Sequence, residues 1–314
     1  MTKTIPVGRK VVVEVPATTA NLGPGFDTLG MALTIHDTLT ATVVDTPGIR
    51  VDVHGVGEGE VPTDETNLIA RSMAHAFASK KIPVPGVLLE AHNVIPHGRG
   101  LGSSGAAIVS GVMAAQGLLE GIAEFSASEL LALATDMEGH PDNIAPSLFG
   151  GLTIAWMTED GPKHKKLSVH RGVSLVVAVP EDASMSTQLA RSLQPETVPH
   201  QDAIFNLSRS ALLIAALIQS PELLFEATED RLHQNYRASA MKDTDELLQK
   251  LRSQGYPAVV SGAGPSVLVL CPDPGQRLDI AQVVEAHGGG KWTSHMLTVD
   301  ERGATVEVVP ALAD

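Results

Sequence analysis

The sequence contains little cysteine, few aromatic side chains and few charges. Cys271 is the only cysteine among 314 residues, which excludes an intramolecular disulfide and a zinc site built from several thiolates. Aromatic residues make up 3% and charged residues 18% of the chain, whereas hydrophobic residues make up 43%. A chain of this length and composition can bury a large core and is long enough for two domains. We therefore expect a compact globular protein in which Cys271 is an inert, buried thiol.

Basic residues are also scarce. The chain has 22 Lys and Arg against 36 Asp and Glu, so its net charge at pH 7 is -14. The densest basic stretch, residues 163–166, is typical of a solvated loop and marks the candidate domain boundary. This balance argues against nucleic acid or an anionic membrane as a partner. Residues 1–10 lack the apolar core of a signal peptide, and no apolar run approaches the length of a membrane span. We expect a cytoplasmic protein that binds neither nucleic acid nor membrane.

Glycine and serine, in contrast, are concentrated in residues 96–107, PHGRGLGSSGAA, directly before an apolar helical run. Glycines let the backbone turn tightly and approach a ligand, and a helix N-terminus offers free N–H groups to phosphate. No Lys-Ser/Thr pair follows the glycines, so the stretch is not a Walker A motif, and its spacing does not fit the dinucleotide fingerprint. From these residues alone, a nucleotide phosphate cradle and a flexible surface loop both remain open.

The same stretch resembles the phosphate-binding motif of the GHMP kinases, P-x-x-x-G-L-G-S-S-x-A. The matching residues are Pro96, Gly100, Leu101, Gly102, Ser103, Ser104 and Ala106. The resemblance implies that the loop binds the phosphates of ATP and that Asn67 contacts the adenine. The implied nucleotide contacts are Asn67, Pro96, His97, Gly98, Arg99, Gly100, Leu101, Gly102, Ser103, Ser104, Gly105 and Ala106.

A second motif lies at residues 16–33, PATTANLGPGFDTLGMAL. Asn21 and Asp27 flank a tight Gly-Pro-Gly loop, and as isolated residues both are typical of turn chemistry, because Asn and Asp bond to nearby backbone. The whole segment, however, is similar to the first motif of the homoserine kinase branch of the family. Residues 138–143, EGHPDN, and residues 261–266, SGAGPS, resemble two further family motifs. The resemblance implies that residues 261–266, the third motif of the family, pack against the phosphate loop. On residues alone, Asp142 is also a candidate helix N-cap and residues 257–271 a hairpin.

The resemblance covers nearly the whole chain and implies a reaction, the ATP-dependent phosphorylation of the side-chain hydroxyl of L-homoserine. Ser104 and Glu138 would hold Mg²⁺. Homoserine carries two opposite charges, so Asp27 suits its ammonium group, and Arg191 and Arg237 suit its carboxylate. The remaining expected substrate contacts are Asn21, His140, Asn143 and Thr187. Relatives in this family are often dimers, so the resemblance also favours a homodimer.

Asn143 stands where mevalonate kinases place a catalytic Asp. An amide cannot take a proton, so catalysis by Asn143, Glu138 and Ser104 would depend on orientation and on the phosphate itself. Two alternatives stay open, another GHMP-type small-molecule kinase and a non-catalytic nucleotide-binding member. The long first motif argues against the former, and the presence of Ser104 and Glu138 argues against the latter.

The expected fold class is α+β with two domains, residues 1–160 and 161–314. The resemblance implies a ribosomal-protein-S5-like N-terminal domain and a ferredoxin-like C-terminal sandwich. Locally, the sequence predicts a strand over residues 11–15 that ends at Pro16, and a hairpin formed by residues 38–44 and 49–53.

Helix signals are also present. They predict a helix from Thr66 to Lys80 and a long apolar helix over residues 201–219. Another helix is expected to start at the capping box Ser126–Glu129 and to end before Gly139.

Overall fold

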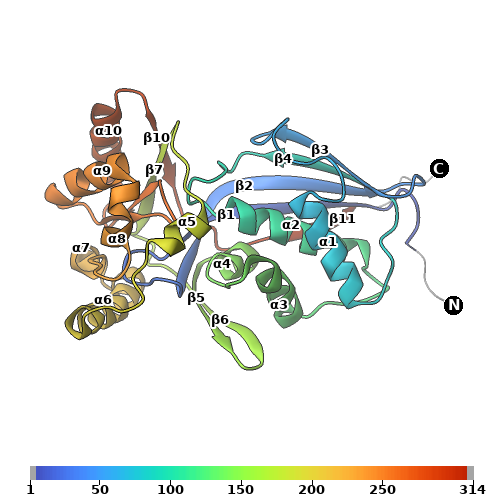
Figure 1. The fold of residues 1–314 in the computed structure, drawn as a ribbon, viewed down its shortest axis with the longest axis horizontal. Helices are drawn as coiled ribbons and strands as arrows, with labels where there is room; N and C mark the ends of the chain where they lie inside the picture. The colour runs from blue at the N-terminus through green and yellow to red at the C-terminus, as the bar shows by residue number, and fades with distance from the viewer. Residues whose placement is uncertain (1–4, 310–314) are drawn as a thin grey trace.

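The computed structural model describes residues 5–309. They form two sheets of mostly antiparallel strands and the helices that pack on them (Figure 1). The first sheet has the order β11-β1-β2-β4-β3, and β5 pairs with both β2 and β6. Its strands are β1 (Lys10–Ala20), β2 (Leu29–Val43), β3 (Ile49–Gly55), β4 (Val87–Asn93), β5 (Leu152–Thr158), β6 (Gly161–Leu167) and β11 (Thr305–Val309).

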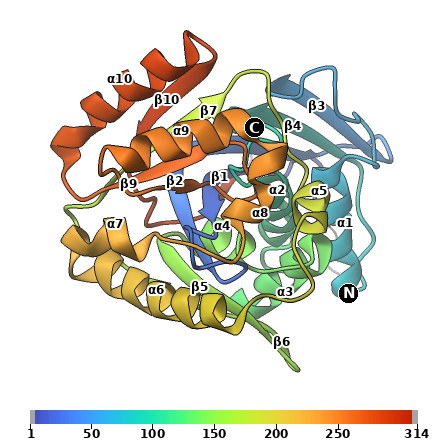
Figure 2. The ribbon, with the colours of Figure 1, turned by 60° about the vertical axis from the view of Figure 1, so that its left-hand side comes forward.

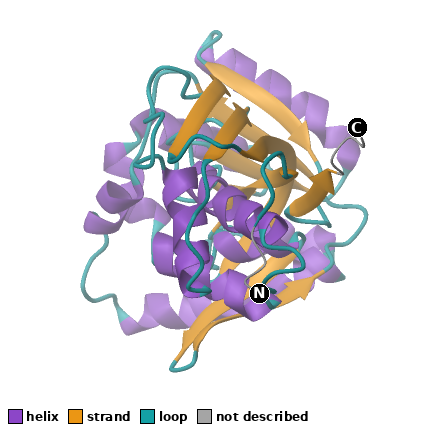
Figure 3. Cartoon of the chain, turned by 90° about the vertical axis from the view of Figure 1, so that its right-hand side faces the viewer, coloured by secondary structure: helices purple, strands orange, loops and turns teal. Residues whose placement is uncertain are grey.

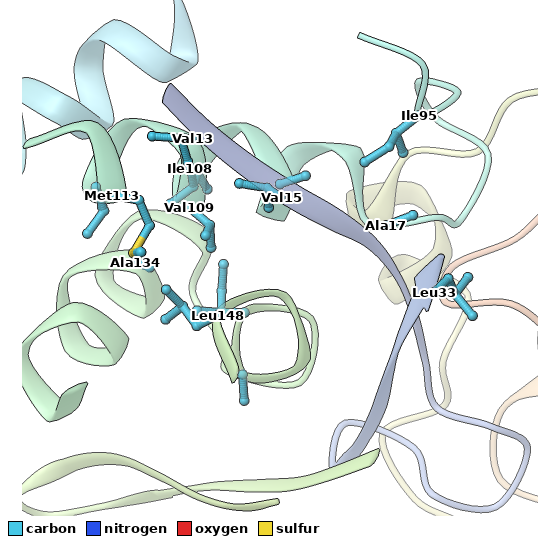
Figure 4. Packing of buried hydrophobic residues seen from close by; sticks show 14 of the residues in the cluster. Val13, Val15, Ala17, Leu33, Ile95, Ile108, Val109, Met113, Ala134 and Leu148 are labelled. Atoms are coloured by element: carbon cyan, nitrogen blue, oxygen red, sulfur yellow. The ribbon is translucent and has the colours of Figure 1, made fainter. Parts of the chain in front are cut away.

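Helices α1 (Leu68–Ser79), α2 (Ser103–Leu118), α3 (Ala127–Glu138) and α4 (Ile144–Phe149) cover one face of this sheet. Figure 3 shows these helices gathered on one side of the strands. β1 alternates between buried and half-buried residues as far as Val15, as expected for a strand with one face on the core. In Figure 4, Val13 and Val15 of β1 lie beside Ile108 and Val109 of α2. This packing fixes the start of α2, where the glycine-rich loop ends.

The second sheet is antiparallel, with the order β10-β7-β9-β8. Its strands are β7 (Ser174–Pro180), β8 (Ala258–Val260), β9 (Val267–Cys271) and β10 (Trp292–Leu297). Helices α9 (Lys242–Ser253) and α10 (Arg277–Gly288) pack on its outer face (Figure 2). The other helices are α5 (Thr187–Ser192), α6 (His200–Ile218), α7 (Leu224–Ala227) and α8 (Gln234–Arg237), with 3₁₀ turns at Pro221–Leu223, Ala238–Ala240 and Pro274–Gln276.

The hydrophobic core continues from one sheet to the other. Leu22 and Leu29 belong to the same buried cluster as Leu213, Leu217 and Leu268. A separate cluster fills the space between the second sheet and its two outer helices. Cys271 is buried there, which confirms the predicted burial, and burial raises the pKa of its thiol to about 11, as expected for an inert cysteine.

Helix α6 is the one helix among residues 5–309 that is long and apolar enough to cross a membrane. The expectation concerned uninterrupted apolar runs, and polar residues interrupt α6 before its apolar run over residues 211–218. The helix packs on the core through Leu213 and Leu217, and it carries Asp202 and Arg209, both in ion pairs.

The predicted hairpin of residues 38–44 and 49–53 is wrong. β2 and β3 do form there, but β4 lies between them, antiparallel to β2 and parallel to β3. Local alternation specifies strands and not their partners, and β4 supplies the buried Val87, Leu89 and Ala91 that suit an inner position. Pro16 likewise does not end β1, because the pairing with β2 shifts register between Pro16 and Ala17, where a missing N–H is tolerated.

The basic stretch at residues 163–166, predicted to be a solvated loop, is part of strand β6. β6 pairs with β5 along its whole length, and its lysines are those of an exposed edge strand, which charge protects from aggregation. The division of the chain at residue 160 stays a prediction, and this pairing favours a division after Leu167.

Helix ends were predicted more closely. The capping box of Ser126 and Glu129 and the left-handed Gly139 are confirmed, as is the hairpin of β8 and β9. Helix α1, however, has Asn67 as its N-cap in place of Thr66, and α4 has Asn143 in place of Asp142. In both cases the cap is one residue later than expected.

Candidate active site

Residues 96–102 lie in the loop that joins β4 to α2. Gly98, Gly100 and Gly102 have φ angles of 64°, 74° and 70°, which glycine adopts without strain. Gly102 is the N-cap of α2 and supplies no side-chain cap, so the first N–H groups of the helix are left for a ligand. This end of α2 therefore suits a phosphate group, which the helix dipole also favours.

Two of these glycines pack tightly against the rest of the protein. A Cβ at Gly100 would lie 2.1 Å from the backbone oxygen of Ser261, and a Cβ at Gly102 would lie 2.0 Å from Thr18 Oγ1. Ser261 Oγ also donates to the backbone oxygen of Gly100 at 2.7 Å. The turn of residues 261–266 thus packs on the phosphate loop, as expected from the third motif.

Five of the other predicted nucleotide residues divide into two groups. Leu101, Gly105 and Ala106 are buried and contribute packing. Arg99 donates to the backbone oxygen of Glu181, and the backbone oxygen of Gly98 accepts from Met185 at 3.0 Å. The loop is therefore attached to the segment that follows β7, directly before α5.

A cavity of about 230 Å³ lies beside the loop, with Asn67, His97, Ser103 and Ser104 among the residues that line it. Apolar side chains such as Val53, Val61 and Ile69 complete the wall, as in most sites for small molecules. The side chain of Asn67 is engaged structurally, because Oδ1 accepts from Ile69 N at 2.9 Å and Nδ2 donates to Pro62 O at 2.7 Å. Its contact with adenine stays a prediction.

Ser104 and Glu138 meet where α2 begins and α3 ends. Ser104 Oγ donates to Glu138 Oε2 at 3.0 Å. Burial raises the pKa of the Glu138 carboxyl, and the hydrogen bond from Ser104 opposes this rise. Within residues 5–309, no three His, Cys, Asp or Glu side chains are grouped to hold a metal ion. One carboxylate and one hydroxyl beside a phosphate site nevertheless fit Mg²⁺, which takes most of its ligands from water and substrate phosphates.

A second cavity, of about 30 Å³, gathers the charged residues. It is lined by Asn21, Asp27, His140, Asn143, Arg191 and Arg237, together with Ala20, Asp142, Gly262 and Ala263. The fold thus brings together two arginines that lie 46 residues apart (237 minus 191). Thr187 is the first residue of α5, but its side chain lies outside the described part of the structure.

Asp27 and Arg191 bind each other across this cavity. Arg191 Nη2 donates to Asp27 Oδ1 at 2.8 Å and Nη1 to Oδ2 at 3.1 Å. Arg237 is buried, donates to Gly262 O at 3.4 Å, and lies over the Phe26 ring at 5.2 Å. Burial lowers the pKa of Arg237, and the nearby Asp27 carboxylate opposes this. Both signs of charge are therefore held in one small space. Arg231, in contrast, pairs with Asp202 at the surface.

Asp142 orients the two polar residues next to it. Its Oδ1 lies 3.0 Å from His140 Nδ1 and accepts from Asn143 N at 3.0 Å. The hydrogen bond to Asp142 raises the pKa of His140, against the effect of burial. On its other side, Asn143 Oδ1 accepts from Thr18 Oγ1 at 3.1 Å.

The loop that carries Asn21 and Asp27 is strained. Asn21, Leu22 and Asp27 have φ angles of 72°, 50° and 54°, which a leucine adopts at a cost of about 1–2 kcal/mol. Asn21 closes the loop, since Oδ1 accepts from Asp27 N at 2.9 Å and Nδ2 donates to Gly262 O at 2.9 Å. The turn chemistry expected of an isolated Asn is thus present, and a direct contact of Asn21 with substrate stays a prediction.

Three residues at the site were not identified from the sequence. His233 is fully buried, lies 2.6 Å from Gly23 O through Nε2, and stacks on Phe26 with ring centroids 4.9 Å apart. No sequence signal marked it. Thr18 and Asp142 were inside recognised motifs, and strand alternation after Pro16 could have drawn attention to Thr18.

Comparison with known proteins identifies the family. Residues 67–151 match the sequence model for the GHMP kinases N terminal domain, and residues 212–290 match that for the GHMP kinases C terminal domain. The chain belongs to the GHMP kinases. It is 68% identical to a homoserine kinase of Clavibacter michiganensis subsp. michiganensis over 98% of both chains, and 67% identical to one of Leifsonia xyli subsp. xyli over 95% of this chain and 92% of that one.

A solved structure shows the same arrangement. The crystal structure of homoserine kinase from Cytophaga hutchinsonii superposes on this GHMP kinase with a TM-score of 0.85, at 25% identity, over 97% of this chain and 99% of that chain. The predicted α+β, two-domain GHMP kinase fold is confirmed.

Proposed function

We propose that this GHMP kinase transfers the γ-phosphoryl group of ATP to the side-chain hydroxyl of L-homoserine, which yields O-phospho-L-homoserine for threonine biosynthesis. The observation that carries the proposal is the charged cavity, where Asp27, Arg191 and Arg237 lie together. An α-amino acid carries one positive and one negative charge, and this cavity offers a partner for each. The near full-length identity to homoserine kinases supports the same acceptor.

Substrate binding requires an exchange of partners. The cavity of about 30 Å³ holds only one or two waters, so an amino acid enters after the bond between Arg191 and Asp27 opens. The ammonium group then binds Asp27, and the carboxylate binds the guanidinium groups of Arg191 and Arg237. Asp27 thus exchanges the guanidinium group of Arg191 for the ammonium group of the substrate, and Arg191 exchanges the carboxylate of Asp27 for that of the substrate.

ATP occupies the neighbouring cavity, with its phosphates on the first turn of α2. Mg²⁺ is the expected cofactor, and Ser104 and Glu138 are the residues that would hold it. The ion neutralises charge on the phosphates when bound. The carboxylate of Glu138 must be deprotonated for this, and its raised pKa makes metal binding sensitive to acid.

The hydroxyl oxygen of homoserine attacks the γ-phosphorus while the bond from that phosphorus to the bridging oxygen of ADP breaks. Asn143 lines the charged cavity and cannot accept a proton, so the hydroxyl proton passes to an oxygen of the transferred phosphoryl group. In this reaction the protein mainly positions the reactants and stabilises charge. His140, held by Asp142, supplies positive charge when protonated.

An ADP-release assay tests the proposal directly. The purified protein is given ATP and Mg²⁺ with homoserine, mevalonate, galactose or no acceptor, and we expect turnover with homoserine alone. Turnover with another acceptor would identify a different GHMP-type kinase. Nucleotide binding without turnover on any acceptor would identify a non-catalytic member.

Location and assembly follow from the same assignment. A soluble biosynthetic enzyme of this kind acts in the cytoplasm, and we propose a homodimer on the precedent of the family. Light scattering at micromolar concentration measures the mass directly, and a mass of 32.9 kDa would mean that the protein is a monomer.

A further inference from the structure

The hydroxyl of Thr18 lies between the phosphate loop and Asn143. Thr18 is buried near the end of β1, and its backbone N donates to Leu101 O at 3.0 Å. Its Oγ1 lies 3.1 Å from Asn143 Oδ1, and the position of a Cβ on Gly102 would be only 2.0 Å from the same oxygen. One buried hydroxyl therefore contacts both the N-cap of the phosphate-binding helix and the amide proposed to face the acceptor.

The direction of this hydrogen bond fixes the orientation of the amide. An amide oxygen only accepts, so Thr18 donates its single hydroxyl proton to Oδ1 of Asn143. The reverse orientation would place the NH₂ group on Thr18 and leave the hydroxyl proton without an acceptor. Among residues 5–309, the structure gives the Thr18 hydroxyl no other side-chain or backbone acceptor. A buried donor left without an acceptor is unfavourable, so the observed orientation is preferred.

We propose that Thr18 is a positioning residue for phosphoryl transfer, which holds Asn143 so that its NH₂ group faces the acceptor hydroxyl. This inference rests on the proposed function. Asn143 then donates to a lone pair of the hydroxyl oxygen and does not accept the hydroxyl proton. The second lone pair stays free to attack phosphorus. Because Thr18 also contacts the loop at Gly102, the same hydroxyl sets the position of the acceptor relative to the phosphates.

Thr18→Val tests this role, since valine has nearly the same shape and lacks the hydroxyl. We expect kcat with homoserine to fall by about 10- to 100-fold, as for other small misplacements of reacting groups. The KM for homoserine and the Kd for ATP, measured by calorimetry, should change by less than about 3-fold. Thr18→Ser keeps the hydroxyl and should retain most of the activity.

The matched control is Thr135→Val. Thr135 is a buried threonine of α3 whose hydroxyl has no hydrogen-bond partner among the described residues, so its kcat should equal that of the wild type. If Thr18→Val and Thr135→Val behave alike while Asn143→Ala retains only a small, measurable kcat, the role of Thr18 is refuted and the proposed function stands. If Thr18→Val weakens ATP binding by the same factor as kcat, Thr18 only packs the loop, which also overturns the proposal.

Two combinations examine the mechanism itself. In the Asn143→Ala background, Thr18→Val should add no further loss, because it acts through that amide. Asn143→Asp removes the N–H donors and adds a base, so we expect low kcat at every pH. A carboxylate at this position that restores or raises kcat would show that an acceptor is needed there, and the proposed donor role would be wrong. Inactivity of the wild type with homoserine would instead refute the proposed function.

Discussion

Arg191→Lys is the most direct test of how the acceptor is bound, because Arg191 makes a contact that lysine cannot copy. In the structure its two terminal nitrogens bond to the two oxygens of Asp27, at 2.8 and 3.1 Å. The same planar contact is expected with the carboxylate of homoserine. An ammonium group is a point charge and retains only one such bond.

The size of the effect follows from that geometry. Loss of one hydrogen bond to a charged group is worth about 1.5–3 kcal/mol, which corresponds to a fall in kcat/KM for homoserine of about 10- to 150-fold. The KM for ATP should be unchanged, since Arg191 does not line the nucleotide cavity. The free energy of unfolding should change by less than about 1 kcal/mol, because the Arg191 and Asp27 side chains are 39% and 37% exposed and water screens the pair.

The assay compares two acceptors, homoserine and 3-aminopropan-1-ol. The second is homoserine without its carboxylate and is called aminopropanol below. The variant should lose activity on homoserine. The wild type should already be poor on aminopropanol, and the substitution should lower that activity only a little further. Arg209→Lys is the matched control, because Arg209 also pairs with a carboxylate, Glu229, at 2.7 Å and with similar exposure. An equal loss on both acceptors would mean that Arg191 does not bind the carboxylate, and the assignment of the pocket would be refuted.

Three further predictions concern the metal, the buried histidine and the loop. Glu138→Gln should raise the Mg²⁺ concentration that gives half-maximal activity. In the wild type this concentration should also rise as the pH falls toward the raised pKa of Glu138. If the variant shows the same pH dependence as the wild type, Glu138 is excluded as the ligand. Burial lowers the pKa of His233, so the stability it contributes is present above pH 6.5 and is lost as the pH falls; the Tm of His233→Gln should fall less steeply between about pH 7 and 5, and parallel curves would contradict this. Gly102→Ala should weaken ATP binding in calorimetry and lower the Tm, because its Cβ would overlap Thr18 Oγ1; wild-type affinity in a folded variant would refute the role of the loop.

Much of this fold can be predicted from the sequence, because several of its signals are local. The capping box at Ser126, the left-handed Gly139 and the turn between β8 and β9 depend on neighbouring residues only. The phosphate loop is also a local pattern of glycines before an apolar helix. Such features can be predicted from one stretch of sequence.

The remaining features depend on contacts between distant segments. The insertion of β4 between β2 and β3 is decided by which strand buries more apolar surface, and β6 is a strand because β5 offers it an edge. The amide of Asn21 is bonded to Gly262, 241 residues away. His233, the N-cap of α8, supports the loop of Asn21 through Gly23 without any motif of its own. No local pattern specifies such partners.

The packing of Gly100 on Ser261 and of Gly102 on Thr18 has a consequence for the thermodynamics of nucleotide binding. These contacts hold the loop through interactions within the protein, so its conformation is established when the chain folds. ATP then meets donors already in place, and little conformational entropy remains to be lost on binding. We expect nucleotide association with a small entropic penalty and with little change in the backbone of residues 96–102. The loop therefore takes its structure when the chain folds, and the nucleotide binds to a loop that is already formed.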